Sequence, residues 1–436
     1  MIRQLDIFEG IPVVGDTVEE RVTYKPIKSS KATFLSGTKK VVHQWFRLTP
    51  SFGPDLVDLM LEHMEFKKGN IVLDPFCGAS TTLIQCKLKG IDSFGFEINP
   101  LLYFVGKTCI RWGLDERIAL ECFEQILFKF NHEVKLRKDV SLEETGLKIP
   151  TIHNVYRWWR KDVLKDLLIL KYAINSLNRE QKYIDFFLLG LAAVLVPDLT
   201  NVTLGKLQLH FIDRSEDDIN VIKTFSEHIK NVISDLNFLN ELNKQPYSEL
   251  YHTDTTDIKF KLDKKAQIVI TSPPYPNRYS YVWNTRPHLF FLDIFNNPKQ
   301  ASALDLKTIG GTWGSATSIL SKGIIEPEYD CLRDILLPTI NAIREKDNLM
   351  ANYVIKYFNL IAKQIVEMEK VIDKKVKVGY VVGNSKIKGV YVATDIILGK
   401  IFESLDLGYK TTEVLRFRKR NSGVDLYESI VYAEKS

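Results

Sequence analysis

Residues 70–82 of this chain read NIVLDPFCGASTT, and the order of residue types in this stretch decides the fold. The short apolar run at residues 71–73 predicts a buried strand, and Gly78 predicts a tight turn before a helix that begins near Thr81. Residues 93–96, SFGF, then read as a second strand. Strand, turn, helix and strand in this order form the βαβ unit of nucleotide-binding α/β folds.

An acidic residue, Glu97, follows the second strand about 20 positions after the glycine turn. In nucleotide-binding βαβ units an acidic residue at this place binds the ribose hydroxyls. The version that binds a pyrophosphate needs the pattern G-x-G-x-x-G, whereas this turn contains only Gly78. The sequence therefore predicts a nucleoside cofactor that has no pyrophosphate.

A second motif lies at residues 266–275, AQIVITSPPY. Its β-branched run predicts a central parallel strand that is covered on both faces, and the strand must end before Pro273 because proline has no backbone N–H. The two prolines fix the direction of the Ser272 and Pro273 carbonyls, and Tyr275 offers a ring on which a planar base could stack. On its own, the motif is explained equally well as a structural turn at a strand end.

Together the two motifs resemble those of the amino-methylating DNA methyltransferases, which use S-adenosylmethionine. That family carries Asp-Pro-Phe-x-Gly-x-Gly and [Ser/Asn/Asp]-Pro-Pro-[Tyr/Phe/Trp]; here the first is DPFCGAS, with Ser80 in place of the second glycine, and the second is SPPY. Residues 378–385 and 428–433 resemble later strands of its sheet. The resemblance implies an α/β fold, with a Rossmann-like methyltransferase sheet and a mostly helical inserted subdomain.

The resemblance also implies the site. Asp74 and the backbone after Phe76 would face the methionine end of the cofactor, Glu97 the ribose, and Asp254 the adenine amino group. Upstream segments would cover the methionine end. The expected cofactor-binding residues are Trp45, Phe52, Asp74, Phe76, Cys77, Gly78, Ser80, Thr81, Glu97, Asn99 and Asp254, and the expected catalytic residues are Ser272, Pro273, Pro274 and Tyr275. A turn-stabilising role for Asp74 and an exposed loop position for Glu97 are the structural alternatives.

The expected reaction is methylation of an exocyclic amine. The Ser272 hydroxyl and the Pro273 carbonyl would accept the two amine hydrogens while Tyr275 stacks on the base, which must be flipped out of duplex DNA. In enzymes that this chain resembles, Ser before Pro-Pro is more typical of cytosine N4 than of adenine N6 methylation. An RNA-base or protein-glutamine methyltransferase and a non-catalytic nucleic-acid-binding scaffold are the alternatives. A cognate restriction endonuclease is a possible partner.

The spacing of the motifs predicts an insertion. Asp74 and Ser272 lie roughly 200 positions apart, whereas three βα units need only about 90 residues. We expect an N-terminal part of the core with the cofactor motif at residues 1–112, a helical insertion for target recognition at 113–247, and the C-terminal part of the core at 248–436. Within the last part we expect an inserted loop at about 276–345, which competes with the insertion for the role of target recognition.

Basic and aromatic residues alternate in three places and predict contacts with DNA, because cations pair with phosphates and rings stack on bases. The candidates are Arg157, Trp158, Arg160, Lys161, Arg278, Tyr279, Arg286 and Arg418. For Trp158 the structural alternative is a core anchor of a helix whose cations face water. For the basic run that contains Arg418 the alternative is a solvated face.

Composition is consistent with this class of protein. The chain has 436 residues, 45% of them hydrophobic, and a net charge of +5, which alone does not indicate nucleic acid. Its five cysteines form no C-x-x-C pair, so neither a zinc site nor a disulfide framework is expected. No secretion signal and no apolar run of membrane-spanning length is found, so we expect a cytoplasmic protein.

Overall fold

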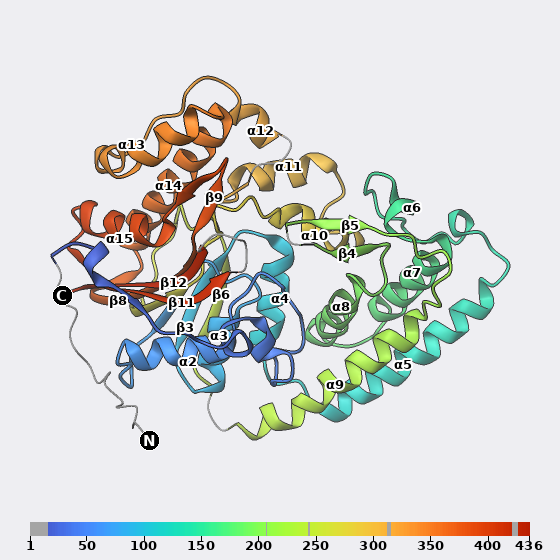
Figure 1. The fold of residues 1–436 in the computed structure, drawn as a ribbon. Coiled ribbons are helices and arrows are strands. Elements are labelled where there is room, and N and C mark those ends of the chain that lie inside the picture. The colour runs from blue at the N-terminus through green and yellow to red at the C-terminus, as the bar shows by residue number, and fades with distance from the viewer. Residues whose placement is uncertain (1–15, 206, 243–244, 312–314, 421–425) are drawn as a thin grey trace, which may run out of the picture.

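The computed structural model describes residues 16–436 apart from 206, 243–244, 312–314 and 421–425. Its centre is an eight-stranded sheet in the order β1-β11-β12-β8-β7-β2-β3-β6 (Figure 1). All neighbouring strands are parallel except β12, which runs antiparallel to β8 and β11. The strands are β1 (Val22–Tyr24), β2 (Val72–Asp74), β3 (Ser93–Glu97), β6 (Ser248–His252), β7 (Ala266–Thr271), β8 (Ile372–Gly383), β11 (Tyr409–Arg420) and β12 (Leu426–Lys435). The α/β prediction is confirmed.

The strand order reverses between β2 and β7. From β2 the chain continues to β3 and then β6 on one side, whereas β7 lies on the other side of β2. Val72 and Leu73 pair with Ile268 and Val269, so the carboxyl ends of β2 and β7 lie level with each other. Such a reversal leaves a crevice above the carboxyl ends of the strands, where open α/β sheets bind their ligands.

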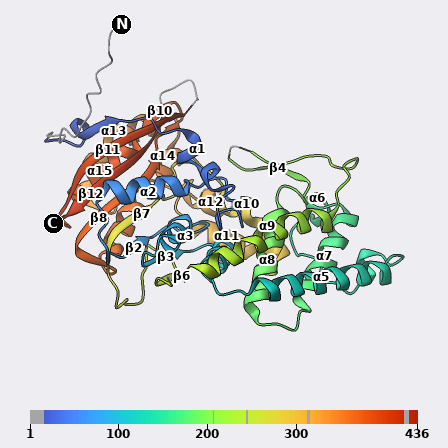
Figure 2. The same ribbon diagram turned by 90° about the horizontal axis from the view of Figure 1, so that it is seen from below.

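The central strands are buried on both faces, as their apolar runs predicted. Val72 and Ile268 pack into the core that contains α2 (Pro54–His63), whereas Leu73 and Val269 pack into a second core. That second core contains α14 (Asn348–Met368) and α15 (Thr394–Ser404). Alternate side chains of a strand point to opposite faces, so each strand contributes to both cores. Figures 1 and 2 show α2 and α3 (Thr81–Leu88) on one face and α14 and α15 on the other.

The chain between β3 and β6 is mostly helical, as predicted. Its helices lie beside the sheet at the right of Figure 1 and pack into one core with α10. One pair of strands was not anticipated, the hairpin of β4 (Val202–Leu204) and β5 (Leu209–Phe211). The helices are α4 (Pro100–Ile110), α5 (Glu116–Leu136), α6 (Val155–Trp158), α7 (Lys161–Asn175), α8 (Gln181–Leu195) and α9 (Val221–Glu241), with the 3-10 helix η3 (Leu142–Glu144).

The segment at 276–345 was expected to be a loop, and this expectation is wrong. The described residues of this segment, which leave out 312–314, form the helices α10 (Tyr281–Phe291), α11 (Pro298–Lys307), α12 (Ser315–Leu320) and α13 (Asp330–Arg344). The side chains of Leu332, Leu336 and Ile340 recur every four positions and are fully or almost fully buried. This apolar stripe packs against α14, which stabilises α13 despite an internal proline.

The remaining elements are short. They are η1 (Glu19–Arg21), α1 (Ser29–Ala32), η2 (Phe34–Gly37), and the paired strands β9 (Ser385–Ile387) and β10 (Val390–Val392). In the described ranges no helix combines the length and the apolar character that crossing a lipid bilayer requires.

Candidate active site

A cavity of about 480 Å³ lies at the carboxyl ends of β2, β3 and β7. This volume is in the range of small-molecule sites, which is about 300–1,000 Å³. Eight of the expected cofactor-binding residues line the cavity: Phe52, Phe76, Cys77, Gly78, Thr81, Glu97, Asn99 and Asp254. All four residues of the second motif line it as well, together with Tyr279 and Arg418. The fold therefore brings the two sequence motifs to one cavity.

Glu97 ends β3 and is 8% exposed. One carboxylate oxygen accepts a hydrogen bond from the Gly78 N–H at 2.7 Å, and the other accepts one from the Asn99 N–H at 2.7 Å. Burial raises the pKa of Glu97 to about 7. Each oxygen has a second lone pair, so the carboxylate can accept further hydrogen bonds from hydroxyls in the cavity.

Asp74 has a different position from the one expected. Its side chain is buried and is not part of the cavity lining. One carboxylate oxygen accepts hydrogen bonds from the Thr271 hydroxyl at 2.6 Å and the Phe76 N–H at 3.0 Å. Burial raises the pKa of Asp74 to about 6. The residue joins the glycine turn to the end of β7, so its role here is to position the turn.

Ser80 also lies outside the cavity lining. Its φ is +64°, in the left-handed region that favours glycine, which explains why a glycine is usual at this motif position. The Ser80 side chain is buried and packs towards α4, where a Cβ on Gly106 would come within 2.1 Å of the Ser80 hydroxyl oxygen. The expectation that Ser80 contacts the cofactor is not met by this geometry.

Asp254 and Asn99 line the cavity and also order their own backbone. One carboxylate oxygen of Asp254 accepts hydrogen bonds from the Thr256 N–H at 2.9 Å and the Thr256 hydroxyl at 2.7 Å. The Asn99 side chain caps α4 by accepting from the Leu101 N–H at 3.0 Å. Asp254, rather than the nearby Asp257, is the carboxylate that lies at the cavity.

The N-terminal segment forms another wall of the cavity that the sequence analysis located only in part. Phe52 lines the cavity as expected, and so do Phe34, Leu48 and Pro50. These residues show no helical or strand periodicity that would have identified them. Trp45, by contrast, is completely buried away from the cavity.

Trp45 anchors this N-terminal segment to the inserted helices. Its ring N–H donates to an Asp235 carboxylate oxygen at 2.8 Å, and its ring packs edge-on against Phe186. The Val42 N–H donates to the same carboxylate at 3.0 Å. The aromatic residue that was expected to cover the cofactor therefore connects the cavity wall to α9.

The SPPY motif has two carbonyls that are already engaged and two acceptors that are not. The Pro274 carbonyl accepts a hydrogen bond from the Tyr357 hydroxyl at 2.8 Å, and the Tyr275 carbonyl accepts one from the Asn277 N–H at 2.8 Å. Among the residues that the structure describes, neither the Ser272 hydroxyl nor the Pro273 carbonyl has a hydrogen-bond partner. Two acceptors are therefore available at neighbouring positions of the cavity wall.

Tyr353 and Tyr357 of α14 contact the motif from the side away from the cavity, and they were not among the expected site residues. The Tyr353 hydroxyl accepts a hydrogen bond from the Arg278 N–H at 3.3 Å, just beyond the motif. Burial raises the pKa of Tyr357 well above its usual value, so its hydroxyl keeps the proton that it donates to Pro274. The only local signal was two tyrosines four positions apart, which places them on one helix face.

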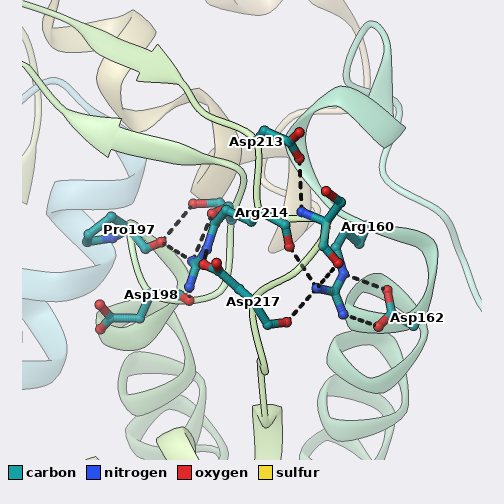
Figure 3. A network of polar contacts seen from close by, with 9 residues as sticks. Arg160, Asp162, Pro197, Asp198, Asp213, Arg214 and Asp217 are labelled. Atoms are coloured by element: carbon teal, nitrogen blue, oxygen red, sulfur yellow. Dashed lines mark hydrogen bonds and ion pairs between the residues drawn. The ribbon is translucent and has the colours of Figure 1, made fainter.

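Arg160, an expected DNA contact, belongs to a structural network instead (Figure 3). Its guanidinium donates to the carbonyls of Arg214 at 2.8 Å and Asp217 at 2.7 Å, and it pairs with Asp162. Arg214 donates in turn to the carbonyls of Asp198 at 2.7 Å and of the adjacent Pro197 at 3.2 Å. The donors of Arg160 are engaged within the protein, so the arginine orders the loop that follows β5.

Replacing Arg160 by methionine is expected to lower stability by about 1–3 kcal/mol, because carbonyls that now bind a cation would lose their donor. Thermal unfolding should show a lower midpoint than in the wild type. Lys161→Met is the matched control: the Lys161 side chain is 62% exposed, and its contacts with Glu143 and the Tyr156 ring lie on the surface, so its midpoint should change little. Equal midpoints for both variants would contradict the structural role of Arg160.

Three of the other DNA candidates lie in or against aromatic clusters. Trp158 is 3% exposed and packs against Phe211 and Trp283, so it is a core anchor. Arg157 and Arg286 have no ion pair within the described ranges, and each guanidinium lies over an aromatic ring, Arg157 over Phe211 at 3.9 Å and Arg286 over Trp283 at 4.8 Å.

Three candidates lie near the cavity itself. Arg418 lines the cavity and pairs with Glu428 across the β11–β12 hairpin. Tyr279 lines the cavity, with its ring edge-on to Tyr281 at 4.8 Å. Arg278 has a φ of +61° where the chain turns away from the motif.

The comparisons with known proteins agree with this arrangement. A family model for N6/N4 DNA methylases matches residues 24–103, which include the glycine turn and Glu97. The type II methyltransferase M.BsoBI of Geobacillus stearothermophilus is 26% identical over 300 residues, and M.MvaI of Kocuria varians is 23% identical over 396 residues. Residues 24–103 of this chain are thus similar to the N6/N4 DNA methylase family, and the wider chain is similar to type II methyltransferases.

The extent of these matches differs between relatives. The alignment with M.BsoBI covers 64% of this chain and 57% of that protein, and the one with M.MvaI covers 85% and 83%. M.AvaI of Nostoc sp., also named a type II methyltransferase, is 22% identical over 89% of this chain and 84% of its own length. The solved structure of the rRNA methyltransferase aviRa of Streptomyces viridochromogenes aligns over 88% of this chain and 86% of its own chain. The TM-score is 0.28 and the sequence identity is 8%, and values this low support no conclusion.

Proposed function

We propose that this protein transfers a methyl group from S-adenosylmethionine to the exocyclic N4 amine of cytosine in duplex DNA. The observation that carries the proposal is the convergence of Ser272–Tyr275 and the turn at Asp74–Gly78 on one cavity at the strand-order reversal. The family, whose members methylate exocyclic amines of DNA bases, supports the same reaction.

The cavity fits a methionine-linked nucleoside. Glu97 presents a buried carboxylate whose remaining lone pairs can accept two ribose hydroxyls. Asp254 has one carboxylate oxygen free of the bonds to Thr256 and can accept from an adenine amino group. A Cβ on Gly78 would lie 3.4 Å from the side chain of Leu48, which also lines the cavity. The absence of a side chain at Gly78 therefore leaves this space free for a ligand. When bound, the cofactor supplies a methyl group activated by a positively charged sulfur.

The protein's contribution to the reaction is to prepare the amine. The amine lone pair is delocalised into the base, so the nitrogen is a weak nucleophile while it stays planar. The Ser272 hydroxyl oxygen and the Pro273 carbonyl can each accept one amine hydrogen and favour a tetrahedral nitrogen. Tyr275 stacks on the ring and holds the nitrogen in line with the methyl group. As the N–C bond forms, the methyl group would leave the sulfur, which becomes neutral. The methylated amine would then carry the positive charge and would release one of its two hydrogens as a proton, past the Ser272 hydroxyl, to water.

Ser272 and the names of the relatives support the choice of base and the biological setting. Ser272 before the two prolines favours cytosine N4, and adenine N6 is the alternative. The relatives named above are type II methyltransferases, which supports a role in a restriction–modification system with a cognate endonuclease. Such an endonuclease would be blocked by the same methyl group.

The proposal is tested by incubating the protein with S-adenosylmethionine labelled in the methyl group and with unmethylated duplex DNA, RNA or protein in parallel. We expect label in DNA alone. Label in RNA or protein alone would contradict the DNA substrate. A chain that binds no cofactor and labels nothing would instead be a non-catalytic scaffold.

Tyr357→Phe is expected to slow methyl transfer by about two- to tenfold, because the Pro274 carbonyl loses a hydrogen bond worth about 0.5–1.5 kcal/mol and the motif becomes less rigid. Cofactor affinity should not change. The control is Tyr409→Phe, which removes a tyrosine hydroxyl that bonds to Glu369 far from the cavity. Single-turnover rates at saturating cofactor separate the two, and an unchanged rate in Tyr357→Phe would exclude the supporting role.

A further inference from the structure

The β4–β5 hairpin reaches from the inserted helices to the cavity. Gly205, at its tip, lines the same cavity as the SPPY motif. The Leu207 carbonyl accepts hydrogen bonds from the Ser280 N–H at 3.1 Å and the Asn284 side chain at 3.2 Å, and the Leu209 N–H donates to Asn284 at 2.9 Å. In Figure 1, β4 and β5 lie above α8, on the side of the inserted helices nearer the sheet. The tip is therefore fastened to the segment that follows the motif.

The base of the hairpin is also fixed. Arg214, just after β5, donates to the carbonyls of Pro197, Asp198 and Thr200, just before β4 (Figure 3). Arg160 holds the loop after β5 at the carbonyls of Arg214 and Asp217. A two-stranded hairpin alone is marginally stable in water, so these bonds give it a defined position.

The tip exposes apolar side chains. Val202 and Leu209 are buried, but Leu204 is 41% exposed and Leu207 is 45% exposed. Leu204 pairs with Leu209 and so lies on the same face of the hairpin as Val202 and Leu209, but unlike them it is left exposed beside the cavity. One cationic side chain lies at the base of the hairpin, where the Arg157 guanidinium is stacked on Phe211 of β5 and has no carboxylate partner in the described parts of the chain.

We propose that this hairpin is a wedge that enters the DNA duplex beside the flipped base, with Leu204 and Leu207 in the space that the base leaves. The inference rests on the proposed function, because only a flipped base creates such a gap. Apolar side chains are the usual wedges between base steps, and a base that leaves the stack costs a few kcal/mol. Apolar contacts in the gap would offset part of that cost while Arg157 faces the adjacent phosphates.

The test compares two duplexes that contain the methylation site of this protein, found first by sequencing methylated bases in DNA treated with the wild type. In one duplex the target base is paired; in the other an abasic position lies opposite it, so that the target flips at little cost. For the variant with both Leu204→Ser and Leu207→Ser, we expect at least tenfold slower transfer on the paired duplex. On the abasic duplex its rate should lie within about threefold of the wild type.

Leu337→Ser is the matched control, because Leu337 is 42% exposed on α13, away from the cavity. It should match the wild type on both duplexes. Equal losses on both duplexes, or no loss on the paired one, would overturn the wedge. A wild type that labels no DNA would contradict the proposed function instead. Unchanged cofactor affinity and melting temperature show that the double variant is folded; if it is not, Leu207→Ala alone must show the same difference between the duplexes.

Discussion

Replacing Ser272 by alanine is expected to lower the rate of methyl transfer by about 100- to 1,000-fold, the usual cost of removing one preorganised hydrogen bond to a group that gains charge in the transition state. The affinity for S-adenosylmethionine should be unchanged, because the Ser272 hydroxyl is assigned to the base and not to the cofactor. Single-turnover transfer and equilibrium cofactor binding measure the two effects separately.

The control is Ser51→Ala, which removes a hydroxyl from another wall of the same cavity. The Ser51 hydroxyl donates to the Leu48 carbonyl at 2.8 Å, so it is already engaged within the protein and should contribute little to the reaction. A Ser272→Ala variant that loses cofactor binding, or one that transfers as fast as Ser51→Ala, would contradict the role of Ser272 as an amine acceptor.

Glu97→Gln is expected to weaken cofactor binding about ten- to a hundredfold. Hydrogen bonds to a charged group contribute about 1.5–3 kcal/mol, and the amide retains only one acceptor oxygen. The substitution should also remove the pH dependence of cofactor affinity that the Glu97 carboxyl group causes. Burial raises the pKa of Glu97 to about 7, so below that pH the free protein holds a proton that two ribose hydroxyls must displace.

In the wild type, the affinity for the cofactor should therefore rise by up to about tenfold per pH unit as pH increases towards 7, and then level off. Glu97→Gln should bind weakly with no such slope. Glu249→Gln is the control, since Glu249 lies on the next strand, pairs with Lys107 and does not line the cavity. A slope that persists in Glu97→Gln would assign the pH dependence to another group.

The features that sequence predicted are those that local patterns encode. The strands β2 (Val72–Asp74, expected at 71–73) and β7, the helix from Thr81 and the position of Glu97 follow from short runs of apolar residues, a glycine and two prolines. These signals act over a few residues. Their convergence on one cavity follows from the general rule that parallel strands present their carboxyl ends to the same edge.

What the sequence did not predict depends on contacts between distant segments. Trp45 was expected at the cavity, but its ring N–H is bound to Asp235 of α9, which is 190 positions away in the sequence. A contact over this distance leaves no signal near Trp45. Arg160 carries the same charge whether it binds a phosphate or the carbonyls of the loop after β5, so composition could not separate these roles. The Tyr357 bond to Pro274 joins residues 83 positions apart and has no local signature.

The most direct test of the account is the identity of the methylated nucleoside. Duplex DNA treated with this protein and S-adenosylmethionine should be digested to nucleosides and analysed by mass spectrometry and chromatography. We expect N4-methylcytosine in this digest and little or none when the Ser272→Ala variant replaces the wild type. N6-methyladenine would contradict the assignment of the base, and methylation of a ring carbon or of no DNA base would contradict the central claim that this cavity methylates an exocyclic amine.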